Sequence, residues 1–258
     1  MKSPEIHVQR HGSGRPLLML HGWAMHGGLF QGLSAALAEH AEVWCVDLPG
    51  HGWSRAEHLG QVEDLLAPLL PEACVVLGWS LGGQIALRLA ADHPRRVAGV
   101  ILLSSTPRFV TGPDWEAGLD LAVLQQFAAD LEQDLPATLQ RFLALQVRGL
   151  ADMRTPLAQL RAALAARPPA RPGALAEGLA RLRDTDLRSH VARVLQPALV
   201  LHGTSDKLTP TAAGRWLAAR LPKAGLVEIE HAAHAPFLSH GAEVLAAVRG
   251  FLEVGLAE

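Results

Sequence analysis

Residues 73–83 read Ala-Cys-Val-Val-Leu-Gly-Trp-Ser-Leu-Gly-Gly. The apolar run at 73–77 is typical of a buried strand, and the pattern that follows Gly83 is typical of a helix. The G-x-S-x-G between them predicts a sharp turn that holds the Ser80 hydroxyl outward, because its glycines let neighbouring backbone pass closely. We therefore expect Ser80 to be a nucleophile. The alternative is an ordinary glycine-rich turn whose serine caps the helix.

The rest of the chain alternates apolar runs with helical patterns. Strands are expected at residues 17–20, 42–47, 73–77, 97–103, 198–203 and 225–229. Helices are expected at residues 31–39, 61–70, 83–92, 210–220 and 241–252. Such alternation is typical of a mostly parallel sheet with helices on both faces, so the sequence predicts an α/β fold.

One long segment interrupts this alternation. Residues 108–184 contain no convincing strand and are rich in Ala, Leu, Gln and Arg at helical spacing, with several prolines that would end the helices. We expect this segment to form an inserted helical lid. The α/β core would then consist of residues 1–107 and 185–258.

Composition and charge narrow the function classes. The chain has 258 residues, 49% of them hydrophobic, and a formal net charge of −2. These values predict a folded protein without the basic surface that nucleic-acid binding requires. The sequence shows no secretory leader and no apolar run of membrane-spanning length, so we expect a cytoplasmic protein with no membrane contact. We also expect a monomer.

The sequence gives no reason to expect a metal or another cofactor. Cys45 and Cys74 lie in apolar strand-like runs. Buried free thiols are commoner there than a disulfide or a metal pair. His231 and His234 are spaced as a metal pair could be, but no third ligand suggests itself.

A serine nucleophile needs a base, and after a turn of this kind the acid and then the histidine follow along the chain. Asp206 comes after the expected strand at 198–203, where the carboxyl ends of parallel strands form a crevice. Two histidines, His231 and His234, come after the next strand. We choose His234 as the base because its loop has run further from the strand, and His231 is the fallback. The alternatives are a turn aspartate and surface histidines.

Acyl transfer also needs hydrogen-bond donors where the oxyanion develops. The N–H of Leu81, the residue after the nucleophile, supplies one. We expect the second from Trp23, in the loop His21-Gly22-Trp23-Ala24 that follows the first expected strand. Plain core packing is the alternative for Trp23. The glycine-containing loop at residues 47–54 is interpreted as structural.

Together these motifs resemble a known family, the pimeloyl-[acyl-carrier protein] methyl ester esterases of biotin synthesis, which have the α/β-hydrolase fold. The resemblance spans nearly the whole chain and rests on residues 21–23, 47–54, 78–83, 141–146 and 233–237. Most specific are Trp79, the Arg-Phe-Leu-Ala-Leu-Gln run and the Ala-His-Ala-Pro-Phe loop. The resemblance implies a substrate site lined by Trp23, Ser80, Leu81, Phe142, Leu143, Ala144, Leu145, Gln146 and His234.

The resemblance also implies a partner. In this family, lid arginines meet the acidic acyl-carrier protein that bears the substrate. Arg141 and Arg154 stand at matching places here, whereas two other family positions fall on Ala137 and Ala158. Neighbouring arginines could substitute, so the expected docking set is Arg141, Arg148, Arg154 and Arg161. Without the resemblance, a solvated helical face would explain these arginines as well.

The expected reaction is hydrolysis of a methyl ester through an acyl-enzyme, without a cofactor. Ser80 would attack, His234 would move the proton, and Asp206 would orient the imidazole. Fold and triad do not fix the substrate, so a broader short-chain carboxylesterase or a carbon–carbon bond hydrolase is the first alternative. The second is a non-catalytic ligand receptor on the same fold, against which the ordered Ser, Asp and His argue. We expect small esters to be accepted as well.

Overall fold

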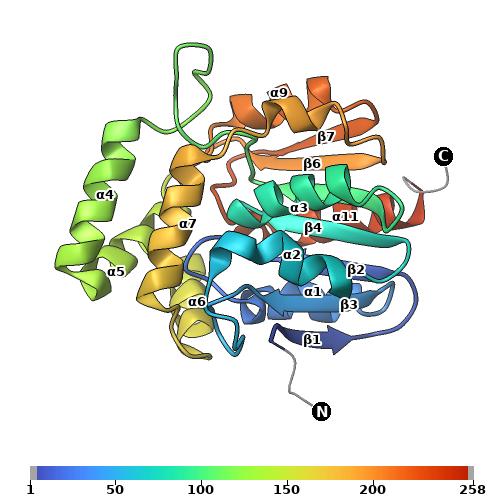
Figure 1. Cartoon of the computed structure of the whole chain (residues 1–258), viewed down its shortest axis with the longest axis horizontal. Helices are drawn as coiled ribbons and strands as arrows, with labels where there is room; N and C mark the ends of the chain where they lie inside the picture. The colour runs from blue at the N-terminus through green and yellow to red at the C-terminus, as the bar shows by residue number, and fades with distance from the viewer. Residues whose placement is uncertain (1–4, 255–258) are drawn as a thin grey trace.

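In the computed structural model, residues 5–254 are described, and they form a seven-stranded sheet in the order β1-β3-β2-β4-β5-β6-β7 (Figure 1). Neighbouring strands run parallel except β1, which pairs antiparallel with β3. The predicted α/β fold is confirmed, and every expected strand is present. The strands are β1 (His7–His11), β2 (Pro16–Leu20), β3 (Glu42–Asp47), β4 (Cys74–Trp79), β5 (Val97–Leu103), β6 (Ala198–Gly203) and β7 (Ala224–Ile229).

Helices cover both faces of this sheet (Figure 1). One face packs against α2 (Val62–Leu66), α3 (Leu81–Asp92), α8 (Arg188–Val191) and α9 (Thr211–Arg220). The other face packs against α1 (Gln31–Leu37) and α11 (Gly241–Glu253). Successive strand residues point to opposite faces, so Leu18 and Leu20 of β2 join the first core whereas Leu17 and Met19 join the second. The short turns between these elements are η1 (Gly27–Phe30), η2 (Leu59–Gln61), η3 (Ala67–Leu69) and α10 (Pro236–Ser239).

The structure differs from the sequence expectation in two places. The edge strand β1 was not expected, because its sequence His-Val-Gln-Arg-His lacks the apolar run of a buried strand. The helix expected at 61–70 is instead the five-residue α2 between two 3₁₀ turns. Pro68 explains the second difference, since a proline has no N–H for the helical hydrogen bond and clashes with the preceding turn.

Between β5 and α8 the chain leaves the sheet and forms four helices, namely α4 (Leu121–Gln133), α5 (Leu135–Gln146), α6 (Arg154–Ala165) and α7 (Pro172–Asp184). They lie beyond the carboxyl ends of the parallel strands, to the left in Figure 1. The segment begins and ends at one place, because Arg108 pairs with Asp186 and the Leu187 N–H donates to the Pro107 carbonyl at 2.8 Å. We refer to residues 108–184 as the lid.

Two further expectations concern the core and the membrane. Cys45 and Cys74 are free, buried thiols, as expected, and burial raises the pKa of each to about 11. Across residues 5–254, no helix is long and apolar enough to cross a membrane.

Candidate active site

The expected nucleophile sits on a strained turn between β4 and α3. Ser80 has a φ of 56° and a ψ of −119°, a conformation that a non-glycine residue rarely adopts. Close packing explains the glycines beside it: a Cβ on Gly82 would overlap with the Leu20 carbonyl oxygen of the neighbouring strand. Ser80 is half-buried, so its side chain remains accessible. This geometry is the one that presents a hydroxyl at the carboxyl edge of the sheet.

Hydrogen bonds fasten the backbone of this turn to the end of β5. The Ser80 N–H donates to the Leu103 carbonyl at 3.0 Å. The Ser80 carbonyl accepts from the Ser105 hydroxyl at 2.8 Å and from the Gly83 N–H at 2.9 Å. The strained conformation is therefore held by its surroundings.

The expected acid and base are in contact and buried. His234 Nδ1 lies 2.8 Å from Asp206 Oδ2, and the two residues are 2% and 5% exposed. The other carboxylate oxygen, Oδ1, accepts the N–H groups of Leu208 at 2.9 Å and Thr209 at 3.0 Å. Burial raises the pKa of the Asp206 carboxyl, but the adjacent His234 and the hydrogen-bond donors outweigh burial and hold the pKa below its ordinary value. Asp206 is thus ionised and able to orient the imidazole.

The loop that carries the expected base is fixed on two sides. The His234 carbonyl accepts the indole N–H of Trp79 at 2.8 Å, and Trp79 directly precedes Ser80. The His234 N–H donates to the carbonyl of Gln146, the last residue of α5, at 3.1 Å. The fallback His231 is exposed, and its N–H donates to the Thr204 hydroxyl at 2.8 Å. The contact with Asp206 therefore favours His234 over His231 as the base.

Trp79, the residue before Ser80, is hydrogen-bonded to His234, but the contact between the Ser80 hydroxyl and the base is not formed. Within residues 5–254, no hydrogen bond joins the Ser80 hydroxyl to His234. Such contacts are often long in enzymes without substrate and tighten when substrate binds.

Within residues 5–254, no cluster of three or more His, Cys, Asp or Glu side chains could bind a metal ion.

The loop that should complete the oxyanion site passes against the nucleophile. A Cβ on Gly22 would lie 3.2 Å from the Cβ of Ser80. His21 braces this loop, because its Nε2 accepts the Leu48 N–H at 2.9 Å while its Nδ1 lies 2.8 Å from the Gly22 carbonyl. An accepting Nε2 requires a neutral ring with the proton on Nδ1. Leu81 is the first residue of α3, where N–H groups have no partner within the helix.

Trp23 connects the same loop to the lid. Its indole N–H donates to the Leu175 carbonyl of α7 at 2.9 Å, and Gly178 of α7 leaves room for the ring. Phe127 of α4 and Phe142 of α5 pack edge-on against the indole, with ring centroids 5.4 and 4.8 Å away. Trp23 is therefore packed in the core against the lid, and its expected role at the oxyanion stays a prediction.

The other lid residues expected in the substrate site divide by burial along α5. Leu143 and Gln146 are fully buried. Leu145 is half-buried, whereas Ala144 is exposed. A helix turns successive side chains to different sides, so the run cannot line one surface as a block. The structure thus brings Phe142 to Trp23 and turns Ala144 away from the interior.

The loop at residues 47–54 is structural, as expected. The buried carboxylate of Asp47 accepts the Gly27 N–H at 2.7 Å and the Trp53 N–H at 2.8 Å. Arg167 of the lid completes its environment, with 2.6 Å between Nη1 and Oδ1.

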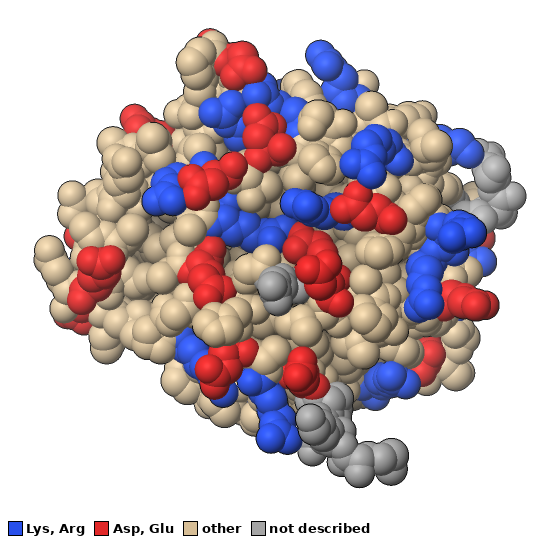
Figure 2. All heavy atoms as spheres, in the orientation of Figure 1, with Lys and Arg blue, Asp and Glu red and all other residues tan. Residues whose placement is uncertain are grey.

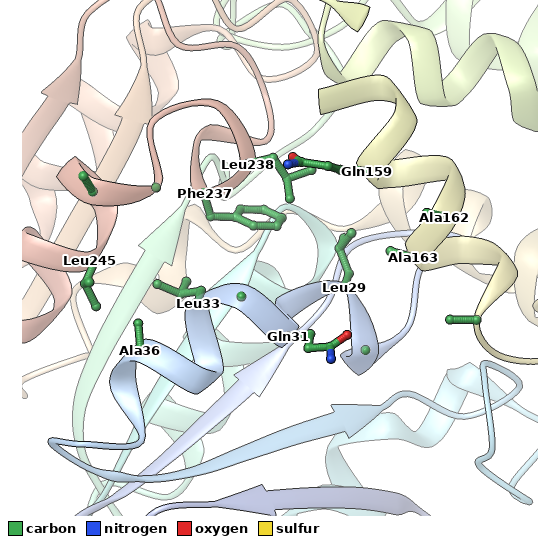
Figure 3. Close-up of a pocket in the computed structure, with 15 residues that line it drawn as sticks. Leu29, Gln31, Leu33, Ala36, Gln159, Ala162, Ala163, Phe237, Leu238 and Leu245 are labelled. Carbon is green, nitrogen blue, oxygen red and sulfur yellow. The ribbon is translucent and has the colours of Figure 1, made fainter. Parts of the chain in front are cut away.

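A pocket of about 560 Å³ lies beside α10, the short helix that follows His234. It is bounded by η1 and α1, by α6 of the lid, and by α10 with the start of α11. Figure 3 shows Leu29 and Phe237 pointing into it, with Ala163 on the lid side. No member of the expected triad lines this pocket, so it is separate from the catalytic site.

The expected docking arginines are all exposed on the lid, but two are already engaged. Arg141 pairs with Asp130 of α4 at 2.9 Å, and Arg161 donates to Gln140 at 2.9 Å. Within residues 5–254, Arg148 and Arg154 form no ion pair. Figure 2 shows acidic and basic side chains interspersed on the face it displays, without one large basic patch.

Two site residues were missed by sequence reasoning. The Thr209 hydroxyl contacts Asp206, and His202 lies 3.6 Å from the same carboxylate. Burial lowers the pKa of His202, so the ring is neutral at neutral pH. A threonine three residues after the acid was the available signal, because Asp side chains commonly accept hydrogen bonds from residues two and three further on.

The chain matches the family described as alpha/beta hydrolase fold over residues 15–241. Among solved structures it is similar to an esterase from Exiguobacterium antarcticum, with a TM-score of 0.87 and 23% identity over 96% of this chain and 95% of that one. A bromoperoxidase from Bacillus anthracis gives the same TM-score, identity and coverage. At this identity the likeness concerns the fold alone.

Curated relatives are more similar in sequence. The chain is 44% identical to the pimeloyl-[acyl-carrier protein] methyl ester esterase of Nitrosomonas europaea, over 91% of this chain and 94% of that one. It is 43% identical to the protein of the same name from Xanthomonas axonopodis pv. citri, over 96% and 98% of the two chains. This chain therefore belongs to the α/β-hydrolase family and, within it, to the pimeloyl-[acyl-carrier protein] methyl ester esterases, which makes it a carboxylic ester hydrolase.

Proposed function

We propose that this enzyme hydrolyses the methyl ester of pimeloyl-[acyl-carrier protein], releasing methanol and the free pimeloyl group on its carrier. The observation that carries the proposal is the buried contact between Asp206 and His234, beside the strained turn of Ser80. The names of relatives that align over nearly the whole chain supply the substrate.

The reaction uses only groups of this chain and water. The Ser80 hydroxyl attacks the ester carbonyl while His234 Nε2 takes its proton. The tetrahedral oxyanion is held by the main-chain N–H groups of Trp23 and Leu81. Each such donor lowers the barrier by about 3 kcal/mol. His234 then protonates the departing methanol, which leaves an acyl group on Ser80. A water molecule, deprotonated by the same imidazole, releases the acid and restores the serine.

The lid provides for the two unlike parts of this substrate. The aromatic cluster of Trp23, Phe127 and Phe142 offers an apolar surface to the methylene chain, at about 0.8 kcal/mol per buried CH₂. The exposed lid arginines face outward, where an acidic carrier protein would dock. Under this proposal, residues 108–184 form a substrate-binding lid on the hydrolase core. A cytoplasmic location and a monomeric state stay predictions.

Purified protein offered a carrier-bound pimeloyl methyl ester tests this proposal directly. We expect stoichiometric free acid and methanol from the wild type and none above background from Ser80→Ala. A panel of small esters and of carbon–carbon cleavage substrates belongs in the same assay. If the panel were turned over and the carrier-bound ester were not, the enzyme would be a broader hydrolase. Turnover by Ser80→Ala within about tenfold of wild type would remove the proposed nucleophile.

A further inference from the structure

The Thr209 side chain lies where the acid and the base of the proposed triad meet. Thr209 is 1% exposed, and its hydroxyl oxygen is 2.7 Å from Asp206 Oδ2. The same oxygen is 3.1 Å from the Ser104 carbonyl oxygen and 3.2 Å from His234 Nδ1. One hydroxyl therefore touches the carboxylate, the imidazole and the residue that follows β5.

The direction of these hydrogen bonds follows from a count of protons. A threonine hydroxyl donates one hydrogen and accepts through two lone pairs. Its two possible acceptors are Asp206 Oδ2 and the Ser104 carbonyl, and the carboxylate is both nearer and charged. The hydroxyl thus donates to Asp206, and a lone pair is left toward the Nδ1–H of His234.

The two carboxylate oxygens of Asp206 are held by different means. Oδ1 accepts two main-chain N–H groups, from Leu208 and Thr209, which fix it irrespective of side chains. Oδ2, which receives the His234 Nδ1–H, has the Thr209 hydroxyl as its other hydrogen-bond partner within residues 5–254. The oxygen that orients the base therefore depends on one side-chain hydroxyl.

We propose that Thr209 is a positioning residue of this hydrolase, whose hydroxyl holds Asp206 Oδ2 at the angle at which it orients His234. This inference rests on the triad of the proposed function. Thr209 touches no reacting atom, and its effect passes through the carboxylate. Without the hydroxyl, Oδ2 would bond to the imidazole alone, which strengthens their mutual attraction and makes the protonated ring harder to discharge.

The charges around this group are few. Asp206 and His234 are in direct contact with the hydroxyl, and His202 of β6 lies 3.6 Å from Asp206 Oδ2. The His202 Nε2 is 2.7 Å from the Thr209 carbonyl oxygen and donates to it, and Glu228 of β7 acts on the same ring from further away. Removing the Thr209 hydroxyl leaves these four titratable groups, two histidines and two carboxylates, in place. A pH effect can therefore be assigned to the lost hydrogen bond.

Thr209→Val tests the inference because it keeps the shape and removes the hydroxyl, while Thr209→Ser keeps the hydroxyl. Thr211→Val is the matched control, since Thr211 donates its hydroxyl to the Gly203 carbonyl at 3.1 Å and touches no triad residue. Each variant is assayed as the full-length enzyme on a soluble ester across pH. The melting temperature of each variant is measured, and Ser80→Ala is run as the inactive reference.

For Thr209→Val we expect kcat to fall about tenfold with KM within about twofold, and the acid limb of kcat/KM to move about 0.5 to 1 pH unit upward. Thr209→Ser should restore most of the loss, and Thr211→Val should match the wild type. An unmoved acid limb in Thr209→Val, or an equal shift in Thr211→Val, would overturn the inference. If Thr209→Val did not fold, Thr209→Ser and Thr209→Ala would be compared instead. A wild-type pH profile of kcat/KM in Thr209→Ser together with a shifted profile in Thr209→Ala would support the inference, and equal profiles in the two variants would reject it. If Ser80→Ala stayed active, the proposed triad itself would fail. That outcome is distinct from the results that would reject the role of Thr209 alone.

Discussion

Arg167 of the lid and Asp47 at the end of β3 form an ion pair inside the protein, with side chains that are 4% and 0% exposed. The guanidinium also lies over the Trp53 ring, 4.4 Å from its centroid. Asp47 accepts two main-chain N–H groups besides, so its charge is fully satisfied. This pair joins the lid to the core at the carboxyl end of β3.

Arg167→Met should therefore lower the free energy of unfolding by about 3 to 5 kcal/mol, because it leaves the Asp47 carboxylate buried without its counter-charge. Arg171→Met is the matched control. Arg171 pairs with Glu57 at the surface, where such pairs contribute about 0 to 1 kcal/mol. Urea unfolding of the two variants measures the difference. Equal losses of stability would mean that burial of the Arg167 pair has no special weight.

The choice of base leads to a prediction with matched substitutions. His234→Asn should reduce kcat on any ester by about 10⁴-fold or more, because members of a triad act as a unit. His231→Asn should stay within about threefold of wild type. Asparagine suits this second site, since His231 has a φ of 60° and asparagine tolerates the left-handed region. Initial rates on a chromogenic ester decide the matter, and the reverse ranking would move the base to His231.

Buried neutral histidines predict how stability depends on pH. Burial lowers the pKa of His51 to about 4 and also lowers that of His21, whose ring lies 5.1 Å away. Between pH 6.5 and 4 the unfolded chain therefore binds more protons than the folded one, and stability falls as the pH falls. His51 contributes about 1.4 kcal/mol per pH unit in this window, and the lowered pKa of His21 acts in the same direction.

His51→Gln should accordingly reduce the loss of unfolding free energy between pH 7 and 5 by about 2 kcal/mol relative to wild type. His58→Gln provides a control of opposite sign. His58 is exposed, and its hydrogen bond with Glu177 raises its pKa, so its contribution to stability is gained as the pH falls. The pH dependence of His58→Gln should become steeper instead of shallower. Denaturant unfolding at the two pH values checks both, and an unchanged slope in His51→Gln would contradict the assignment.

Local patterns explain what could be predicted from the sequence. The strand, the G-x-S-x-G and the helix around Ser80 are contiguous, so their turn could be inferred without any tertiary contact. Asp206 and the histidine loop follow apolar strands, and parallel strands bring their carboxyl ends to one edge. The sequence does not separate His231 from His234 by a local pattern, because both lie on one loop; the contact with Asp206 in the structure separates them.

Long-range contacts explain what the sequence did not reveal. Thr209 meets the Ser104 carbonyl across 105 residues of chain, and Arg167 meets Asp47 across 120. Phe127 reaches Trp23 from α4, in a segment whose spacing indicates only an amphipathic helix. Nothing in the local pattern of Arg167 or Phe127 distinguishes them from ordinary surface or core positions, and the spacing of Thr209 from Asp206 indicates a local turn but not the contact with Ser104. Arg167 and Phe127 acquire their roles from where the lid is placed on the sheet, and Thr209 from the pairing of β5 with β6.

The lid arginines differ in the charge they can offer a carrier protein. Arg141 is neutralised by Asp130 of the neighbouring helix, and Arg161 is engaged by Gln140. Arg148 follows α5 and Arg154 begins α6, and both are exposed. We therefore expect these two, more than the paired arginines, to attract an acidic carrier.

Reversing the charge of Arg148 and Arg154 to Glu together should raise KM for the carrier-bound ester by about tenfold, through slower association. A small soluble ester should be hydrolysed as by wild type, since both side chains are exposed on the surface. Added salt should weaken the wild type on the carrier-bound substrate as well, because exposed charges are screened within about 10 Å at 0.1 M. Arg95→Glu is the control, because this exposed residue precedes β5 at the amino ends of the parallel strands. If the double reversal slowed both substrates equally, these arginines would support the lid fold or the acyl pocket, and carrier docking would have to be sought on another surface.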